Sequence, residues 1–331
     1  MSVPEATAGV APEEAPEAAL RFIEAGRGAA IATVMETWGS APRPAGSQLA
    51  VSGDGALVGS VSGGCVEAAV ASEAEAALAD GRPRLLEYGV ADEDAFAVGL
   101  ACGGTIRILL EPVGGSGPDP AMLSEIVAAR AARRGVVLAT RPGDWAHRLI
   151  TGPGDPLWPE AEAALRADRS AFAGEWFLCA HAPAPRLVIV GAAHVGQHLA
   201  PMARIAGFDV TVVDPRSAFA TEARFPGTRV MVDLPDEALA EIGLDARVAV
   251  VTLTHDPKID DPAIVATLGS DAFYLGCLGS RKTHAQRLER LAGLGGALDR
   301  IHAPVGLAIG ARTPAEIAVA ILAEVVGRLR A

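Results

Sequence analysis

The segment LVIVGAAHVG is the feature that most constrains how this chain can fold. Its β-branched run predicts a buried strand over Arg186–Val190, and Gly191 then leads into a helical pattern over Ala193–Ala206. A second strand is predicted over Asp209–Val213 and is followed directly by Asp214. A strand, a glycine turn, a helix and an acidic residue after the next strand are the dinucleotide fingerprint of a Rossmann fold.

The rest of the second half continues the alternation of strands and helices. Further strands are predicted over residues 228–232, 248–253 and 272–276, and a capping box starting at Thr313 begins the last helix. In the fingerprint, Asp214 is expected to accept hydrogen bonds from ribose hydroxyls, while the helix N-terminus faces a pyrophosphate. Ala193 stands where the fingerprint has its second glycine, so a Rossmann fold with an altered or vacant nucleotide site remains an alternative.

In the first half, the sequence GSVSGGCVE follows a short predicted strand over Ala56–Val61 and enters a predicted helix over Cys65–Asp80. Paired glycines, Gly63 and Gly64, let backbone N–H groups approach an anion at such a turn. We expect Cys65 in the first turn of the helix, where a thiolate is favoured. A tight turn with a small buried cysteine is an equally open interpretation.

Strands are also predicted on either side of this turn and helix. Gly53-Asp54-Gly55 separates a predicted strand over Gln48–Ser52 from the one that starts at Ala56, which is a hairpin signal. After the helix, Arg84–Tyr88 is predicted to form a further strand.

A second glycine–cysteine cluster, GLACGG, precedes a predicted strand over Thr105–Leu110. Strands, helices and hairpins up to Pro183 predict one α+β domain over residues 13–183, and the Pro183-Ala184-Pro185 segment is the expected linker. Residues 1–12 are rich in Pro, Ala and Glu and predict a disordered tail. The fold class is therefore α/β, with an N-terminal α+β domain and a Rossmann-like parallel-sheet domain over 186–331.

The charge and the cysteine spacing exclude several classes of function. A formal net charge of -12 disfavours a nucleic-acid partner. The four cysteines contain no C-x-x-C pair, which argues against a structural zinc site or a disulfide framework and favours a reducing compartment. Neither a signal peptide nor an uncharged apolar run of membrane-spanning length is present, so a cytoplasmic protein without a membrane partner is expected.

Three weaker signals lie in loops. Thr254-His255-Asp256 follows a predicted strand end and could supply acid–base or metal-ligand groups, although a polar loop with a helix cap is the simpler interpretation. Gly279-Ser280-Arg281 joins a strand end to a helix start and could bind an anion, or be a capped helix with solvated cations. His194 could face the cleft, and Arg43 lies on a Gly/Pro-rich loop of the kind that shapes sites.

Several of these motifs occur together in one order, and together they resemble the xanthine dehydrogenase accessory factor family (XdhC/CoxI). The matching stretches are ATVMETWGSAPRPAGSQLAVSGDGALVGSVSGGCVE, GLACGG, GAAHVG, DPR, THDPKID, YLGCLGSRK and PVGLAIGARTPAEIAVAILAE. The resemblance covers residues 28–324, and residues 114–183 carry least of it. Ala193, Gly196 and Ala308 depart from the pattern of the family.

The resemblance implies a maturation factor that binds the molybdenum cofactor, as molybdopterin or its dinucleotide form. Such a factor holds the cofactor while a cysteine desulfurase supplies sulfur, and it delivers the cofactor to an apo molybdenum hydroxylase. Cys65 and Cys102 are the candidate sulfur relays and the candidate ligands of the molybdenum. The candidate cofactor-binding residues are Arg43, Ser62, Gly63, Gly64, Cys65, Glu67, Gly103, Gly191, His194, Gly196, Asp214, Arg216, His255, Gly279, Ser280 and Arg281.

We expect the cofactor to be shared by the two halves, and we expect a homodimer. Two other functions are compatible with the residues. One is an NAD(P)-dependent oxidoreductase that uses the fingerprint and Asp214. The other is a thiol redox sensor built on Cys65 and Cys102.

Overall fold

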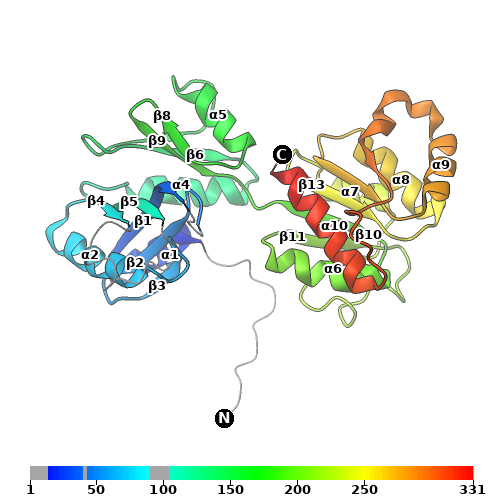
Figure 1. The fold of residues 1–331 in the computed structure, drawn as a ribbon, viewed down its shortest axis with the longest axis horizontal. Coiled ribbons are helices and arrows are strands. Elements are labelled where there is room, and N and C mark those ends of the chain that lie inside the picture. The colour runs from blue at the N-terminus through cyan, green and yellow to red at the C-terminus, as the bar shows by residue number, and fades with distance from the viewer. Residues whose placement is uncertain (1–13, 40–42, 90–103, 331) are drawn as a thin grey trace, which may run out of the picture. The chain divides into compact units, whose positions relative to one another are not determined.

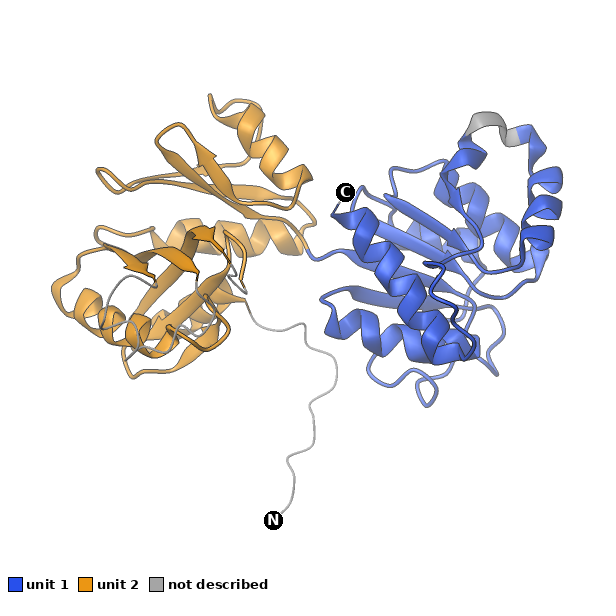
Figure 2. Ribbon diagram, in the orientation of Figure 1, with its two compact units in different colours: residues 1–12, 184–331 blue, residues 13–183 orange. Residues whose placement is uncertain are grey.

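The computed structural model describes residues 14–39, 43–89 and 104–330. These residues form two compact units, one ending at Pro183 and the other beginning at Ala184 (Figure 2). The predictions for residues 1–12 and for the turn with Cys102 and Gly103 concern residues outside the described ranges.

The C-terminal unit contains a six-stranded sheet in the order β12-β11-β10-β13-β14-β15, and every neighbouring pair is parallel. Figure 1 labels β10, β11 and β13 of this sheet. The strands are β10 (Arg186–Val190), β11 (Asp209–Val213), β12 (Arg229–Met231), β13 (Val248–Thr252), β14 (Tyr274–Cys277) and β15 (Ile301–His302). The strand order reverses between β10 and β13, so the topological switch point of this doubly wound sheet lies at the carboxyl ends of these two strands. The predicted Rossmann-like architecture is thus confirmed.

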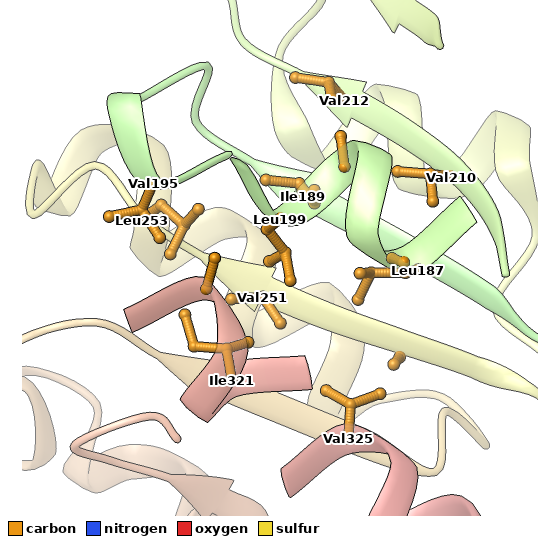
Figure 3. Close-up of a cluster of buried hydrophobic side chains, with 14 of the residues drawn as sticks. Leu187, Ile189, Val195, Leu199, Val210, Val212, Val251, Leu253, Ile321 and Val325 are labelled. Atoms are coloured by element: carbon orange, nitrogen blue, oxygen red, sulfur yellow. The ribbon is translucent and has the colours of Figure 1, made fainter. Parts of the chain in front are cut away.

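Helices cover both faces of this sheet. They are α6 (His194–Ile205), α7 (Pro235–Ile242), α8 (Pro257–Leu268), α9 (Arg281–Arg290) and α10 (Pro314–Leu329), with a 3₁₀ segment, η1 (Ala292–Arg300). Leu187 and Ile189 of β10 pack in the cluster with α6 and α10 that Figure 3 shows, whereas Val188 and Val190 pack with α7 and α8. Successive strand residues point to opposite faces, so a run of four apolar residues is what a strand buried on both faces requires.

The N-terminal unit contains two antiparallel sheets, ordered β3-β2-β1-β5-β4 and β7-β6-β9-β8. Their strands are β1 (Ala29–Trp38), β2 (Gln48–Ser52), β3 (Leu57–Gly59), β4 (Arg84–Tyr88), β5 (Thr105–Pro112), β6 (Val136–Arg141), β7 (Ala146–Ile150), β8 (Ala171–Ala173) and β9 (Trp176–His181). The described helices are α1 (Ala15–Glu24), α2 (Glu67–Asp80), α4 (Pro120–Ala131) and α5 (Trp158–Arg166).

One hydrophobic cluster joins the two sheets of this unit. It combines Phe22 of α1, Ile31 of β1 and Ile126 of α4 with Leu138 of β6 and Phe177 of β9. Helix α2 packs on the other face of the five-stranded sheet, where Val70, Ala74 and Ala77 are buried. The two sheets of this unit therefore share one hydrophobic core.

One local expectation needs correction, and one short strand was not expected. Helix α2 begins at Glu67 with Val66 as its N-cap, so Cys65 lies in the turn before the helix and not in its first turn. The short strand β8 was not predicted, because three residues are too few to show a periodicity. The hairpin of β2 and β3 around Gly53-Asp54-Gly55 is confirmed.

Candidate functional site

The turn between β3 and α2 is closed by the carboxylate of Glu67, the first residue of the helix. Glu67 Oε1 accepts from the backbone N–H groups of Val61 at 3.2 Å, Ser62 at 2.9 Å and Gly63 at 3.1 Å. Glu67 Oε2 accepts from the N–H of Gly64 at 2.9 Å. The backbone donors that the glycine pattern predicted as an anion cradle are therefore occupied by a side chain of the same turn.

Two hydroxyl groups complete this network. Ser60 Oγ donates to Glu67 Oε1 at 2.7 Å, and Ser62 Oγ donates to Glu67 Oε2. Burial alone would raise the pKa of Glu67, but the hydrogen bonds from the Ser62 and Ser60 hydroxyls and from the Ser62 N–H outweigh it and lower the pKa to about 2. Glu67 is thus ionised at neutral pH. It lies at the N-terminal end of α2, where the helix dipole favours a negative charge.

The two glycines of the turn have backbone conformations that other residues rarely adopt. Gly63 has a φ of 82° and Gly64 a φ of 119°. These angles direct successive N–H groups toward one point, as in anion-binding turns. The point is the Glu67 carboxylate, so the glycines shape the turn around an internal anion.

Cys65 is carried on this turn. Its N–H donates to Ser62 Oγ at 3.0 Å, and the N–H of Val66 donates to the same oxygen at 3.0 Å. The residue is half-buried, whereas Cys179 and Cys277 are buried, and burial raises the pKa values of those two thiols to about 12 and about 11. Among the cysteines in the described ranges, Cys65 alone combines partial exposure with a fixed backbone.

Arg43 reaches the same turn from the loop between β1 and β2. Its Nε donates to the backbone oxygen of Ser60 at 3.3 Å, and the residue is exposed. The structure therefore brings together Arg43, Ser62, Gly63, Gly64, Cys65 and Glu67, all of which were predicted as site residues. Ser60 belongs to the network but was missed, because a serine before a glycine turn has no sequence signal of its own.

In the C-terminal unit, the glycines of the fingerprint serve close packing. Gly191 has a φ of 103°, and a Cβ there would lie 2.4 Å from Cγ2 of Thr254. A Cβ on Gly196 would lie 3.4 Å from the backbone oxygen of Gly191 and 3.4 Å from Cγ2 of Ile189. These two glycines allow β10, the loop after β13 and α6 to approach one another closely.

Asp214 is fully buried at the end of β11, and its acceptor positions are used within the protein. Its Oδ1 accepts from the backbone N–H of Arg216 at 2.9 Å and from Arg216 Nε at 2.8 Å. Its Oδ2 accepts from the N–H of Ala192 at 2.8 Å and from Arg216 Nη2 at 2.7 Å. Burial would raise the pKa of Asp214, but the hydrogen bonds from Arg216 and Ala192 outweigh it and lower the pKa.

The other predicted residues of this unit lie at the same carboxyl edge of the sheet or on the helices that begin there. His194 is the exposed first residue of α6, with its ring 5.2 Å from that of His198. Ser280 caps α9 through the N–H of Thr283, with Gly279 before it at a φ of 142° and Arg281 as the first helical residue.

The loop after β13 is the capped polar loop that the sequence predicted. Asp256 caps α8 by accepting from the N–H of Lys258, and His255 before it has a φ of 63°. Asp260 is buried and accepts from Thr254 Oγ1 at 2.6 Å and from the N–H of His255 at 3.2 Å. Burial raises the pKa of Asp260 despite these hydrogen bonds.

Arg287 on α9 was missed. Only 1% of the residue is exposed, its Nη2 donates to the backbone oxygen of Leu278 at 3.0 Å, and it lies 4.0 Å from Oδ2 of Asp260. It occurs in RKTHAQRLER, where an arginine among other charged residues predicts a solvated side chain.

Within the described ranges, no three or more His, Cys, Asp and Glu side chains are grouped so that they could hold a metal ion. None of the helices described there has the length and apolar character needed to cross a membrane. Cys102, the second predicted molybdenum ligand, lies outside these ranges. The expectation that both halves share the cofactor stays a prediction.

Comparison with known proteins gives consistent matches over both units. A model of the XdhC and CoxI family matches residues 22–89, and a model of the XdhC Rossmann domain matches residues 187–325. The chain is 33% identical over 310 residues to the molybdenum cofactor insertion chaperone PaoD of Escherichia coli K12, covering 93% of this chain and 85% of that protein. It is 28% identical to a probable xanthine dehydrogenase component of Bacillus subtilis 168, covering 90% of this chain and 92% of that protein.

A crystal structure of a Bacillus halodurans protein described as a xanthine dehydrogenase has the same fold. It matches with a TM-score of 0.78 at 25% identity, and the match covers 96% of each chain.

Proposed function

This chain belongs to the XdhC and CoxI family, and on that premise we propose that it binds the molybdenum cofactor and delivers it to an apo molybdenum hydroxylase. The support is the 33% identity to PaoD, whose name states insertion of the molybdenum cofactor, over most of both chains. The name of the Bacillus subtilis relative connects the same architecture with xanthine dehydrogenase.

One structural observation carries the assignment of the site: the Glu67 carboxylate fixes the turn that presents Cys65, the half-exposed thiol. Molybdenum carrying sulfur ligands suits a thiolate donor. We therefore propose that Cys65 contacts the metal end of the cofactor, which is the cargo of this protein. Because Glu67 takes the N–H groups of Gly63 and Gly64, these glycines shape the turn, and Arg43 is the better candidate there for an anionic group.

The wider proposal includes steps that depend on other proteins. A cysteine desulfurase supplies the sulfur while the cofactor is bound, and a homodimer is the expected assembly. Cys102 and Gly103 remain candidates for the same site. The cofactor, when bound, supplies the molybdenum centre on which the sulfur is installed, and this chain supplies the thiol and the fixed backbone beside it.

The test is co-expression with molybdate, followed by measurement of molybdenum and pterin in the purified full chain. Wild-type protein is expected to retain both, and Cys65→Ser is expected to retain several-fold less while keeping its thermal unfolding temperature. Cys179→Ala is the control, because that thiol is buried in the core. If Cys65→Ser retains and transfers the cofactor as the wild type does, Cys65 has no such role.

An NAD(P)-dependent oxidoreductase is the second candidate, and the Rossmann sheet with its glycine turn favours it. The saturated carboxylate of Asp214 disfavours NAD as its cofactor, because the usual acceptor of the unsubstituted ribose hydroxyls has no free lone pair. Tight NADH binding with hydride turnover by the purified protein would support this candidate over the chaperone.

A further inference from the structure

We propose that the carboxyl edge of β11 binds a phosphate monoester through Arg216 and does not hold an unsubstituted ribose diol. This site deepens the proposed function, because it names the chemical group that the Rossmann unit recognises.

The Asp214 carboxylate has no acceptor position left for a ligand. An ionised carboxylate has about four lone-pair positions. Four donors occupy them here: the N–H of Ala192 and the N–H, Nε and Nη2 of Arg216. A vicinal diol needs an acceptor for its hydroxyl hydrogens, and Asp214 offers none while Arg216 is in place.

Arg216 retains hydrogen-bond donors that Asp214 does not use. A guanidinium carries five N–H donors, and the bond to Asp214 uses Nε and one hydrogen of Nη2. Both hydrogens of Nη1 and the second of Nη2 have no protein acceptor within the described residues, and the side chain is 41% exposed. These donors form the second edge of the planar, fork-shaped guanidinium group, and their spacing matches two oxygens of a phosphate.

The guanidinium group of Arg216 is held in a fixed orientation. The guanidinium carbon of Arg216 lies 4.6 Å from the ring centroid of Phe219, and that of Arg224 lies 5.2 Å from the same ring. Arg224 also donates to the backbone oxygen of Phe219 at 3.1 Å. The bidentate bond to Asp214 and the contact with Phe219 hold the plane of Arg216 before any ligand arrives, which reduces the entropy lost on binding.

Acidic neighbours determine how the anion must bind. Asp256 and Asp260 lie within electrostatic range of Arg216, so the edge is not strongly positive overall. Both of these carboxylates already accept hydrogen bonds, Asp256 from the N–H of Lys258 and Asp260 from Thr254 and His255. Recognition must therefore come from directed hydrogen bonds of Arg216, and an acceptor-only group such as a phosphate fits them.

Two ligands carry this chemistry. One is a nucleotide with a 2′-phosphate on its ribose, which an arginine at this position of a Rossmann fold is suited to bind. The other is the phosphate tail of the molybdenum cofactor without a nucleotide extension. The inference rests on the proposed function only for the second ligand.

The experiment is calorimetric titration of the full chain with NADP⁺ and NAD⁺, which differ only in the 2′-phosphate. Wild-type protein should bind NADP⁺ at least about tenfold more tightly, as expected for charge-assisted hydrogen bonds. Arg216→Ala should abolish the difference, and Arg216→Lys should reduce it, because the charge stays but the fork is lost. Arg229→Ala is the matched control, since Arg229 is exposed at the opposite, amino end of β12 and should not change the preference.

Asp214→Asn separates the two models of this edge, with thermal unfolding as the check on folding. If Asp214 were the ribose acceptor, this variant would lose NAD⁺ affinity. We expect the preference for the phosphorylated nucleotide to weaken but to persist, because Arg216 loses one of its two side-chain bonds to residue 214 and keeps the second edge of its guanidinium group.

The source of the phosphate is decided by the cofactor recovered from molybdate-supplemented cells. The pterin tail is the ligand if NADP⁺ is not preferred over NAD⁺ and the Arg216→Ala protein retains less of the cofactor form that lacks a nucleotide, while its retention of the dinucleotide form is unchanged. Equal binding of NADP⁺ and NAD⁺ together with unchanged cofactor recovery in Arg216→Ala overturns the inference. A clear NADP⁺ preference in a protein that retains no molybdenum would leave the inference standing and count against the proposed function.

Discussion

Ser62 donates both its backbone N–H, at 2.9 Å, and its hydroxyl hydrogen to the carboxylate of Glu67. The same hydroxyl oxygen accepts from the N–H groups of Cys65 and Val66. The serine thus links the internal anion of the turn to the backbone of the candidate cysteine. This arrangement makes Glu67 a positioning residue for Cys65, since its oxygens contact the turn and not the thiol.

Glu67→Gln is expected to loosen the turn, because the amide NH₂ would face backbone donors where an oxygen now accepts. We expect a loss of about 1–3 kcal/mol in unfolding free energy, the usual consequence of leaving such donors unpaired. Iodoacetamide should also label Cys65 at a changed rate, measured in a Cys102→Ser background. Glu73→Gln is the control, since that partly exposed residue of α2 pairs with Arg84 and does not contact the turn. Identical labelling and stability in Glu67→Gln and the wild type would contradict the positioning role.

The same carboxylate predicts an acid-dependent contribution to stability. The pKa of Glu67 falls from 4.5 to about 2 on folding, so the folded state favours the ionised form. Its contribution is present above pH 4.5 and is lost as the pH falls towards 2. The difference in unfolding temperature between wild type and Glu67→Gln should therefore shrink over this window. If the difference in unfolding temperature stays constant down to about pH 2.5, ionisation of Glu67 is not the source of the stabilisation.

His181 predicts a second pH dependence, in a different window. The histidine is buried in β9, and burial, aided by the charge of Arg130, lowers its pKa from 6.5 to about 3. Below pH 6.5 the unfolded chain binds a proton that the folded chain does not, so stability falls as the pH drops towards 3, by up to about 1.4 kcal/mol per pH unit. Urea unfolding at about pH 7.5 and about pH 5.5, on either side of the unfolded pKa, measures this slope. His181→Gln should flatten this slope, because it removes the buried imidazole.

Gly191→Ala tests the close approach of β10 and the loop after β13. The new Cβ would meet Thr254 Cγ2 at 2.4 Å, in a backbone conformation with a φ of 103°. Placing an alanine in this backbone conformation costs about 1–3 kcal/mol by itself. Because the clash with Thr254 adds to this cost, we expect a larger loss in the free energy of unfolding. Gly207→Ala is the matched control, because its φ is 89° but nothing lies within 4 Å of the added carbon. Equal losses in the two variants would mean that packing against Thr254 is unimportant.

Arg287→Ala tests the buried arginine of α9. Its removal takes away the hydrogen bond to Leu278 and leaves the buried Asp260 without its cationic neighbour. A loss of about 3–5 kcal/mol is expected for an unpaired buried charge. The nearby Arg290 is 39% exposed and paired with Asp261. Changing it to Ala should lower the free energy of unfolding by less than about 1 kcal/mol. Chemical denaturation of the two variants compares them directly.

The sequence alone determined much of the fold. The strands β2, β4, β10 and β11 begin and end at the predicted residues, and the capping box at Thr313 begins α10 as expected. Periodicity, glycine punctuation and capping residues are local signals, so they are readable without knowing what packs against them. The parallel arrangement of the Rossmann sheet followed from the alternation of strands and helices, since right-handed βαβ connections leave few alternatives.

Only the tertiary structure decided how the donors and acceptors of the candidate site are paired. The sequence identified the turns at Gly63 and Gly191 as places where backbone N–H groups can meet an anion. It could not show that Glu67 fills the first turn or that Arg216 saturates Asp214 beside the second. Whether a carboxylate is free or engaged depends on side-chain rotamers and on distances of a few tenths of an ångström. The same residue pattern is compatible with either state, so the coordinates of the folded chain are needed to tell them apart.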